Sequence, residues 1–251
     1  ELPGVGSNYA DHFCTRMNWR VSQPITLNEQ SRGIALAKAV TQYFATRKGI
    51  LTLATGLAHG FVRTRPGLSS PDVQYFFMHA SYANAADRKL DHEPGMTIGV
   101  SPLRPESRGT IHVKSADPFA APAIRPNILA TSEDQDTLVR GMKIARDIVG
   151  QSAMKPFVSH EMSPGKNVET DEQWLHFARE NGQTIYHPVG TCSMGTGPRA
   201  VVDERLRVHG IEGLRVIDAS IMPTQISGNT LAAVLMIAEK GAAMIREDRA
   251  A

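Results

Sequence analysis

A histidine lies in a loop-forming segment in the last third of the chain. Residues 184–195, TIYHPVGTCSMG, place His187 beside an aromatic residue and directly before Pro188. The proline and glycines of this stretch predict a rigid loop with exposed backbone, and such loops often position side chains for chemistry. An imidazole that titrates near neutral pH is suited to general acid or base catalysis. The alternative is that His187, one of nine histidines, only satisfies a hydrogen bond in the core.

A second segment could face a phosphate or an electron-rich ring. Residues 214–242, LRVIDASIMPTQISGNTLAAVLMIAEKGA, predict a strand over 214–218, a turn as far as Gly228 and a helix from about Asn229. The free amides and the dipole of a helix start favour negative charge, which would act at Asn229 and Thr230. The alternative is that Asn229 or Ser227 is only an N-cap, a role that contributes about 1 kcal/mol.

Two glycine patterns resemble dinucleotide-binding motifs but lack the required context. The first begins at Gly4, reaches Tyr9 at its third position and has no strand before it. The second begins at Gly195 and contains Pro198, and the residues after it do not suit a helix start. Because the motif needs a strand before it and a helix after it, we interpret both as turns.

The composition is that of an ordinary globular protein. The 251 residues are 41% hydrophobic, and 27 basic against 25 acidic residues leave a formal charge of +2. Such a small charge gives no reason to expect a nucleic-acid partner. Cys14 and Cys192 lack metal-ligand spacing, so no metal site is expected, and so few cysteines fit a reducing, cytoplasmic compartment. The apolar run 231–238 is far shorter than the roughly 20 residues of a membrane span, so no transmembrane segment is expected.

Helices and short strands must position these segments. Helical spacing of apolar residues predicts four helices, at 28–46, 132–150, 170–182 and about 229–247. Ser132 with Gln135, and Thr170 with Gln173, stand in capping-box positions. The side chains expected to face the core are Ile34, Ala37, Val40, Tyr43 and Phe44 in the first helix, Leu138, Met142, Ala145 and Val149 in the second, Trp174, Phe177 and Ala178 in the third, and Leu231, Val234, Leu235, Ala238, Ala242 and Ile245 in the last.

Strand-like runs at 73–78, 96–100, 110–114 and 214–218 complete the layout. The first three cluster between helices instead of alternating with them. The sequence therefore predicts an α+β fold with a mixed or antiparallel sheet flanked by helices. The run 214–218 with the last helix is typical of the end of a strand-to-helix nucleotide-binding unit.

Several motifs together resemble one family. They are LPGVGSNYADH near the start, SPLRPESRGTIHVKSADP and IRPNIL in the middle, and YHPVGTCSMG and the 214–242 segment near the end. On these residues the chain is similar to the glucose-methanol-choline (GMC) oxidoreductases, within them to the choline-dehydrogenase-like alcohol dehydrogenases. The chain opens with Glu1 in what reads as mid-protein sequence, so we interpret it as the carboxy-terminal portion of a longer protein.

The resemblance implies an FAD enzyme whose dinucleotide-binding glycines belong to a missing amino-terminal half. The expected domains are a connecting segment at 1–24, a substrate-binding domain at 25–183, and the catalytic loop with the carboxy-terminal strand-helix piece of the FAD-binding domain at 184–251. Without the amino-terminal half, FAD is expected to be absent from this chain or weakly bound. The implied partners are an alcohol substrate, an oxygen or quinone-like electron acceptor, and that missing half.

The resemblance also assigns roles to particular residues. It implies that His187 is the catalytic base and that Asn229 completes the catalytic pair. The residues expected to contact FAD are Asp218, Ala219, Asn229, Thr230 and Leu231. Tyr186 is a candidate for substrate contact. The residues 225–227 depart from the proline or glycine richness common before that asparagine, which leaves the shape of the loop open.

The implied reaction is oxidation of a primary alcohol, choline-like or other, to the aldehyde. Two alternatives remain: a hydroxynitrile lyase of the same family, and an isolated substrate-binding domain that catalyses nothing. For the chain alone, without its cofactor-binding half, inactivity is expected.

Overall fold

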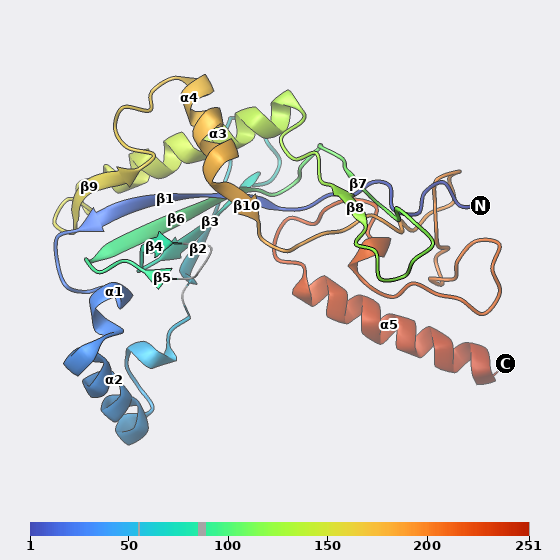
Figure 1. The fold of residues 1–251 in the computed structure, drawn as a ribbon, viewed down its shortest axis with the longest axis horizontal. Helices are drawn as coiled ribbons and strands as arrows, with labels where there is room; N and C mark the ends of the chain where they lie inside the picture. The colour runs from blue at the N-terminus through green and yellow to red at the C-terminus, as the bar shows by residue number, and fades with distance from the viewer. Residues whose placement is uncertain (55, 85–88, 251) are drawn as a thin grey trace. The chain divides into compact units, whose positions relative to one another are not determined.

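The computed structural model describes residues 1–54, 56–84 and 89–250, which divide into two compact units (Figure 1). Unit 1 comprises residues 1–13, 102–135 and 184–251, and unit 2 comprises residues 14–101 and 136–183. Each unit is therefore assembled from separated segments, whereas the sequence suggested three contiguous ones. The predicted boundary between residues 183 and 184 coincides with a boundary of the units. The assignment of the units to substrate and cofactor stays a prediction.

Unit 2 is built on one sheet with the strand order β10-β1-β6-β3-β2, and β9 also pairs with β1. β1 pairs antiparallel with β6 and with β9, and β2 pairs antiparallel with β3. This arrangement confirms the predicted α+β fold with a mixed or antiparallel sheet. The strands are β1 (Phe13–Val21), β2 (Gly56–Val62), β3 (Val73–Met78), β6 (Gly95–Pro102), β9 (Val158–Ser163) and β10 (Gly182–Thr184).

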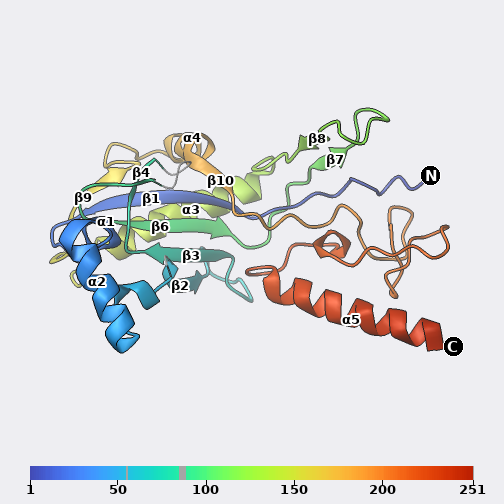
Figure 2. The same cartoon turned by 60° about the horizontal axis from the view of Figure 1, so that its bottom comes forward.

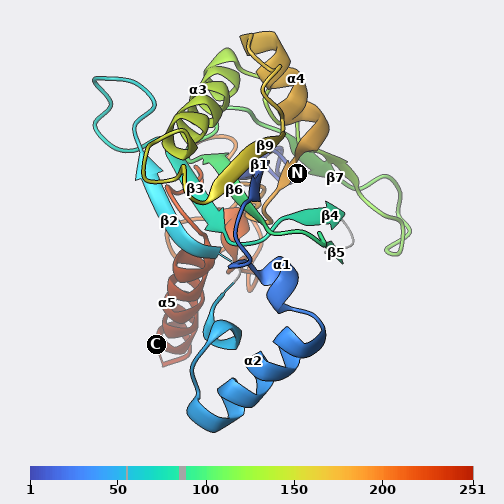
Figure 3. The same ribbon diagram turned by 90° about the vertical axis from the view of Figure 1, so that its left-hand side faces the viewer.

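Two helices, α3 (Ser132–Val149) and α4 (Asp171–Asn181), cover one face of this sheet (Figures 2 and 3). The helix α3 approaches the strands closely at Gly141, where an added Cβ would lie 2.9 Å from a methyl group of Val100. At the same point the hydroxyl of Tyr75 donates a 2.8 Å hydrogen bond to the Gly141 carbonyl. The absence of a side chain at Gly141 therefore permits the layer packing.

The two covering helices agree closely with the sequence prediction. Leu138, Met142, Ala145 and Val149 are all buried, as the stripe on α3 required. Thr131 instead of Ser132 caps this helix, since its hydroxyl accepts from the amide of Asp134 at 3.3 Å. In α4 the predicted capping box of Thr170 and Gln173 is present, and the helix stops before Gly182. Trp174 and Ala178 are buried and Phe177 is half-buried.

The helix predicted at 28–46 is present but interrupted near its start. The chain forms a short α1 (Leu27–Gln30) and then α2 (Gly33–Thr46), which residues 31–32 separate, and Gly33 at the start of α2 has a left-handed φ of 50°. Only Ala39 of α2 is buried, while Ile34 and Phe44 are 77% and 68% exposed. The spacing of apolar residues predicted the helix, but the side chains expected to face the core are mostly exposed in this structure. The remaining elements of unit 2 are η1 (Ile50–Thr52), β4 (Tyr82–Asn84) and β5 (Lys89–Leu90).

Unit 1 consists mostly of loops held by short pairings. Its elements are the hairpin of β7 (Thr110–His112) with β8 (Ala123–Arg125), the turn η2 (Ala219–Ile221) and the helix α5 (Leu231–Ala250). The predicted strand at 214–218 is wrong, because there only Arg215 forms an isolated bridge, to Arg207. The helix of the expected strand-helix piece is present, and its strand is not. No helix among the described residues is long and apolar enough to span a bilayer.

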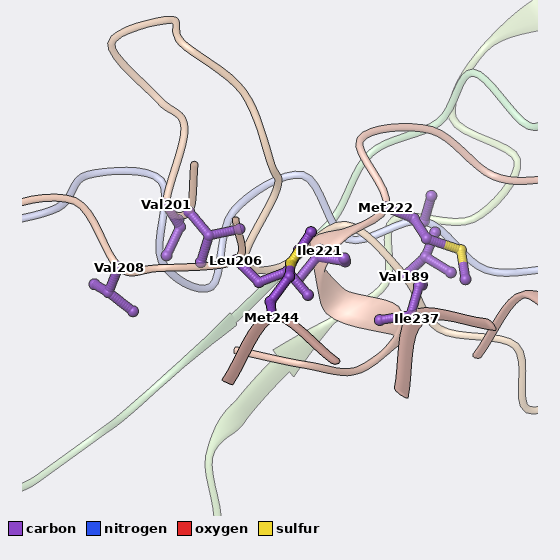
Figure 4. Close-up of a cluster of buried hydrophobic side chains, with 10 residues drawn as sticks. Val189, Val201, Leu206, Val208, Ile221, Met222, Ile237 and Met244 are labelled. Carbon is purple, nitrogen blue, oxygen red and sulfur yellow. The ribbon is translucent and has the colours of Figure 1, made fainter. Parts of the chain in front are cut away.

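A cluster of aliphatic side chains joins α5 to the loops of unit 1 (Figure 4). Ile237, Gly241 and Met244 form the buried side of α5. The predicted stripe is therefore displaced around the helix, since Leu231 and Leu235 are 67% and 58% exposed. Because α5 is apolar on most sides, periodicity alone could not select the buried one. The cluster comprises Ala10, Val189, Val201, Val202, Leu206, Val208, Ile221, Met222, Ile237 and Met244.

Candidate active site

The backbone of His187 is fixed from both sides. Its amide donates a 2.9 Å hydrogen bond to Oδ1 of Asp11, and its carbonyl accepts a 2.8 Å bond from Nε2 of Gln225. Tyr186 directly before it has a left-handed φ of 65°, which turns the chain at this point. His187 itself is half-buried. The predicted rigid loop therefore has specific anchors, and they come from distant parts of the sequence.

Asp11 is the anchor on the amino-terminal side. It is 5% exposed, and its Oδ2 accepts hydrogen bonds from the hydroxyls of Tyr9, at 2.7 Å, and Thr184. Burial and the bond to Asp11 raise the pKa of the Tyr9 phenol, which keeps that hydroxyl a donor. With three donors on one carboxylate, Asp11 joins the segment 9–12 to the segment 184–187.

A second histidine contacts His187 through its ring. His12 is 1% exposed, its Nδ1 lies 2.9 Å from Nδ1 of His187, and its Nε2 lies 2.9 Å from the carbonyl oxygen of Leu103. The two rings meet edge to face, with centroids 5.2 Å apart. Sequence reasoning did not assign a role to His12. The available signal was the Asp-His pair that ends the LPGVGSNYADH motif.

Both histidines are shifted toward the neutral form. Burial lowers the pKa of His187, against a smaller opposing effect of the Asp11 charge. Burial also lowers the pKa of His12, and the nearby His187 adds to this, against the opposing effects of the carbonyls of Leu103 and Ile226 and of Asp11. The lowered pKa of each ring favours the uncharged pair, in which a ring nitrogen can accept a proton.

The ring nitrogen Nε2 of His187 has no hydrogen-bond partner among the residues that the structure describes. The hydrogen bonds of His187 there are made by its amide, its carbonyl and Nδ1. The nitrogen that could meet a substrate is thus the one that the fold leaves unpaired.

The loop that leads to Asn229 is tied to the same place. Gln225, which bonds to the carbonyl of His187, is 6% exposed and stands four residues before Asn229. Nη1 of Arg104 donates a 2.8 Å bond to the hydroxyl of Ser227 in the same loop. Asn229 is exposed. Gln225 thus ties the loop that precedes Asn229 to His187, and both predicted catalytic residues lie in unit 1.

The start of α5 differs slightly from the prediction. The carbonyl of Thr230 accepts the first helical bond, from the amide of Val234 at 3.0 Å. The helix begins at Leu231, and Asn229 therefore precedes it instead of starting it. Thr230 is 8% exposed, so most of its side chain is enclosed. Asn229 thus lies two residues before the first turn of α5, whose amides favour an anionic group, and its contact with a ligand stays a prediction.

Asn8 is a further anchor of the loop over residues 184–195, through its hydrogen bond to Ser193. Sequence reasoning assigned it no role. Its Nδ2 donates to the hydroxyl of Ser193 at 2.8 Å and to the carbonyl of Pro223 at 3.0 Å. Its Oδ1 accepts from Nε of Arg108 at 2.9 Å. A Cβ at Gly190 would lie 2.2 Å from the Asn8 carbonyl oxygen, so the backbones meet closely here. The GVGSN sequence was the only available signal.

The other residues predicted to contact FAD or substrate lie partly in a turn and partly at exposed positions. Asp218 caps η2, since its Oδ1 accepts from the amide of Ser220 at 2.8 Å, and Ala219 opens that turn. Leu231 and Tyr186 are 67% and 75% exposed, so both side chains can meet a ligand. Their contacts with FAD and substrate stay predictions.

Comparison with known proteins identifies the class. Residues 105–238 match the family model described as GMC oxidoreductase. Together with the sheet and its covering helices, this match defines the chain as part of an oxidoreductase. The chain belongs to the GMC oxidoreductase family.

Relatives in sequence and structure agree with this class. An oxygen-dependent choline dehydrogenase from Serratia proteamaculans is 39% identical over 248 residues, which cover 98% of this chain and 44% of that protein. An alcohol dehydrogenase [acceptor] from Pseudomonas putida is 38% identical over 249 residues, with coverages of 98% and 44%. A formate oxidase from Aspergillus oryzae RIB40, studied for FAD modification, aligns with a TM-score of 0.85 at 24% identity, with coverages of 98% and 48%. The chain spans less than half the length of each.

The groups near Asn229 fit the flavin that the family implies. A bound flavin is stabilised by hydrogen-bond donors at its electron-rich pyrimidine end, and oxidation of an alcohol beside it needs a base. The first turn of α5 could provide such donors, and Nε2 of His187, which has no hydrogen-bond partner among the described residues, could provide the base.

Proposed function

We propose that the complete protein oxidises a primary alcohol, choline-like or other, to the aldehyde, with FAD as its cofactor. The observation that carries this proposal is the anchoring of His187 by Asp11, Gln225 and His12 with its Nε2 unpaired. An alcohol becomes an aldehyde when the hydroxyl loses a proton and the carbinol carbon loses a hydride. FAD, when bound, supplies the two-electron acceptor for that hydride.

His187 accepts the hydroxyl proton at Nε2. Its lowered pKa keeps this nitrogen unprotonated at neutral pH, which is the state a base requires. The fixed backbone of His187 also limits the directions in which the ring can point. Such placement of a base typically contributes about 10² to 10⁴ in rate.

Asn229 orients the substrate. A carboxamide cannot act as a base, but it can donate a hydrogen bond to the alcohol oxygen or accept one from it. The oxygen is thereby held while the proton leaves toward His187, and the carbinol carbon keeps one orientation. Asp218, Ala219, Thr230 and Leu231 complete the surface that we assign to the cofactor.

The oxidising partner is oxygen or a quinone-like acceptor. The name of one relative, an oxygen-dependent choline dehydrogenase, supports oxygen, and that of another, an alcohol dehydrogenase [acceptor], leaves the acceptor unspecified. Those relatives are more than twice as long as the part that this chain matches, so the remaining half of the FAD site lies in sequence outside this chain. The 251-residue chain alone is then inactive and binds FAD weakly or not at all.

The test is anaerobic addition of alcohols to the complete flavoprotein. Choline, short alcohols and sugars are each mixed with the oxidised protein while flavin absorbance is followed. Bleaching by a primary alcohol, with formation of the aldehyde, is the expected result. Cleavage of a cyanohydrin without bleaching would make the protein a hydroxynitrile lyase. Binding without either reaction would leave a non-catalytic domain.

A further inference from the structure

His12 lies buried against the proposed base, and its two ring nitrogens have different partners. Nε2 faces the Leu103 carbonyl oxygen at 2.9 Å, and Nδ1 faces Nδ1 of His187 at 2.9 Å. From this geometry we infer that His12 is a positioning residue that selects the tautomer of His187, with the proton on Nδ1 and the lone pair on Nε2. The role given to that lone pair rests on the function proposed above.

The first step is the proton on His12. A carbonyl oxygen can only accept a hydrogen bond, so Nε2 of His12 must carry a hydrogen. In a neutral imidazole only one nitrogen is protonated, which leaves Nδ1 of His12 as an acceptor. The carbonyls of both Leu103 and Ile226 act on the His12 ring, and the one with a hydrogen-bond distance to a named nitrogen is that of Leu103, 2.9 Å from Nε2. We therefore take the Leu103 carbonyl to determine the tautomer of His12.

The second step is the charge of His12. Its side chain is 1% exposed, and a buried imidazolium without a carboxylate partner is costly. The nearest carboxylate, Asp11, already accepts from the Tyr9 hydroxyl, the Thr184 hydroxyl and the His187 amide. None of these bonds comes from His12. The neutral form of His12 is therefore the stable one.

The third step fixes His187. Two facing nitrogens 2.9 Å apart need one hydrogen between them, and His12 cannot supply it. Nδ1 of His187 must therefore be protonated, and the lone pair of a neutral His187 falls on Nε2. This is the nitrogen without a partner among the described residues.

The same bond persists after proton transfer. When Nε2 of His187 takes the substrate proton, Nδ1 keeps its hydrogen and the donor becomes cationic. A charged donor strengthens its hydrogen bond to a neutral acceptor, so His12 stabilises the imidazolium without any rearrangement. The arrangement suits a base that gains charge during the reaction.

The reverse tautomer is disfavoured by the backbone. A hydrogen on Nδ1 of a neutral His12 would leave a lone pair on Nε2 facing the lone pairs of the Leu103 oxygen. That contact loses a buried hydrogen bond and leaves two buried acceptors without a donor, which is costlier than leaving them in water. The backbone carbonyl of Leu103 thus acts on His187 through His12.

The test is nitrogen NMR of the complete protein labelled with ¹⁵N-histidine, at a pH where both rings are neutral. The His187 signal is assigned from its loss in His187→Gln. We expect Nδ1 of His187 to be protonated and Nε2 to be unprotonated in the parent protein. A hydrogen on Nε2 would overturn the inference without affecting the proposed reaction, because the NMR experiment needs no substrate.

Two variants separate the two contacts of His12. His12→Asn places a carboxamide oxygen near the position of Nδ1 and keeps the acceptor for His187. His12→Gln places a donor near the position of Nε2 and keeps the bond to Leu103 but loses that acceptor. The Nδ1 tautomer should persist in His12→Asn and be lost in His12→Gln, with flavin reduction about tenfold slower in the latter. Equal tautomer populations and equal rates in the two variants would contradict the assignment.

Discussion

Nε2 of Gln225 donates a 2.8 Å hydrogen bond to the carbonyl oxygen of His187, although 38 residues separate them in the chain. Gln225 is buried and stands in the loop that ends at Asn229. This bond ties the backbone at His187 to the loop that precedes Asn229, the other residue proposed to be catalytic.

Loss of that link should slow the reaction. In Gln225→Glu the shape is kept, but the donor is replaced by an acceptor that faces the His187 carbonyl. We expect flavin reduction to fall by about 10 to 10², because small displacements of reacting groups have effects of that size. Gln151→Glu is the matched control, since Gln151 donates a 2.9 Å bond to the Asp147 carbonyl on an exposed helix end. An equal effect of the two changes would show that the Gln225 contact is not specific.

The amide of Asn229 should act on the chemical step. In Asn229→Ala the alcohol oxygen loses its orienting partner, so the limiting rate of flavin reduction should fall by about tenfold or more. The substrate dissociation constant from the same stopped-flow traces should change less. Ser227→Ala, two residues earlier in the same exposed loop, controls for disturbance of the loop. A change in the dissociation constant alone would assign Asn229 to binding instead.

The pH dependence should follow the neutral form of His187. A base works when unprotonated, so kcat/KM should rise with pH on the acidic side and level off above the His187 pKa, which burial holds below the usual range of a histidine. The Asp11 charge opposes that lowering. Asp11→Asn should therefore move the midpoint of the acidic limb to still lower pH. A midpoint that rises in Asp11→Asn would contradict this electrostatic account.

Packing of α5 gives a test of the fold that is independent of catalysis. Alanine in place of a helical glycine ordinarily adds about 1 kcal/mol of stability. At Gly241 the new Cβ would lie 2.5 Å from Cγ2 of Ile217, so Gly241→Ala should lower the free energy of unfolding by about 1 to 3 kcal/mol. In an Ile217→Ala background the same change should be neutral or stabilising, as urea unfolding would show. Destabilisation of equal size in both backgrounds would exclude overlap with Ile217 as the cause.

Local sequence signals predicted the elements that are stabilised locally. α3 and α4 followed from apolar stripes and the Thr170 capping box, and β3 from a run of aromatic and β-branched residues. The loop carrying His187 followed from its proline and glycines. These signals arise from residues a few positions apart, so the elements they predict form without depending on distant tertiary contacts.

The remaining features depend on contacts between distant residues. The sequence predicts only a connecting segment over residues 1–24, where the structure has β1. The partners of β1, β6 and β9, lie far along the chain, so no local pattern indicates this pairing. His12 was missed because its partners are Leu103 and His187. The predicted buried side of α5 was wrong, because apolar residues occur on most sides of this helix and its sequence does not specify which side is buried. The close approach of Ile217 to Gly241 marks the buried side in the structure. Sequence periodicity contains no information on these pairings.

The most direct test of the account is single-turnover flavin reduction in His187→Ala of the complete protein, mixed anaerobically with its alcohol. The proton then has no acceptor at the position of Nε2, so the rate should fall by at least about 10² while FAD stays bound. His176→Ala, at an exposed position on α4, should react like the parent. Flavin reduction in His187→Ala at close to the parent rate would contradict the assignment of His187 as the base.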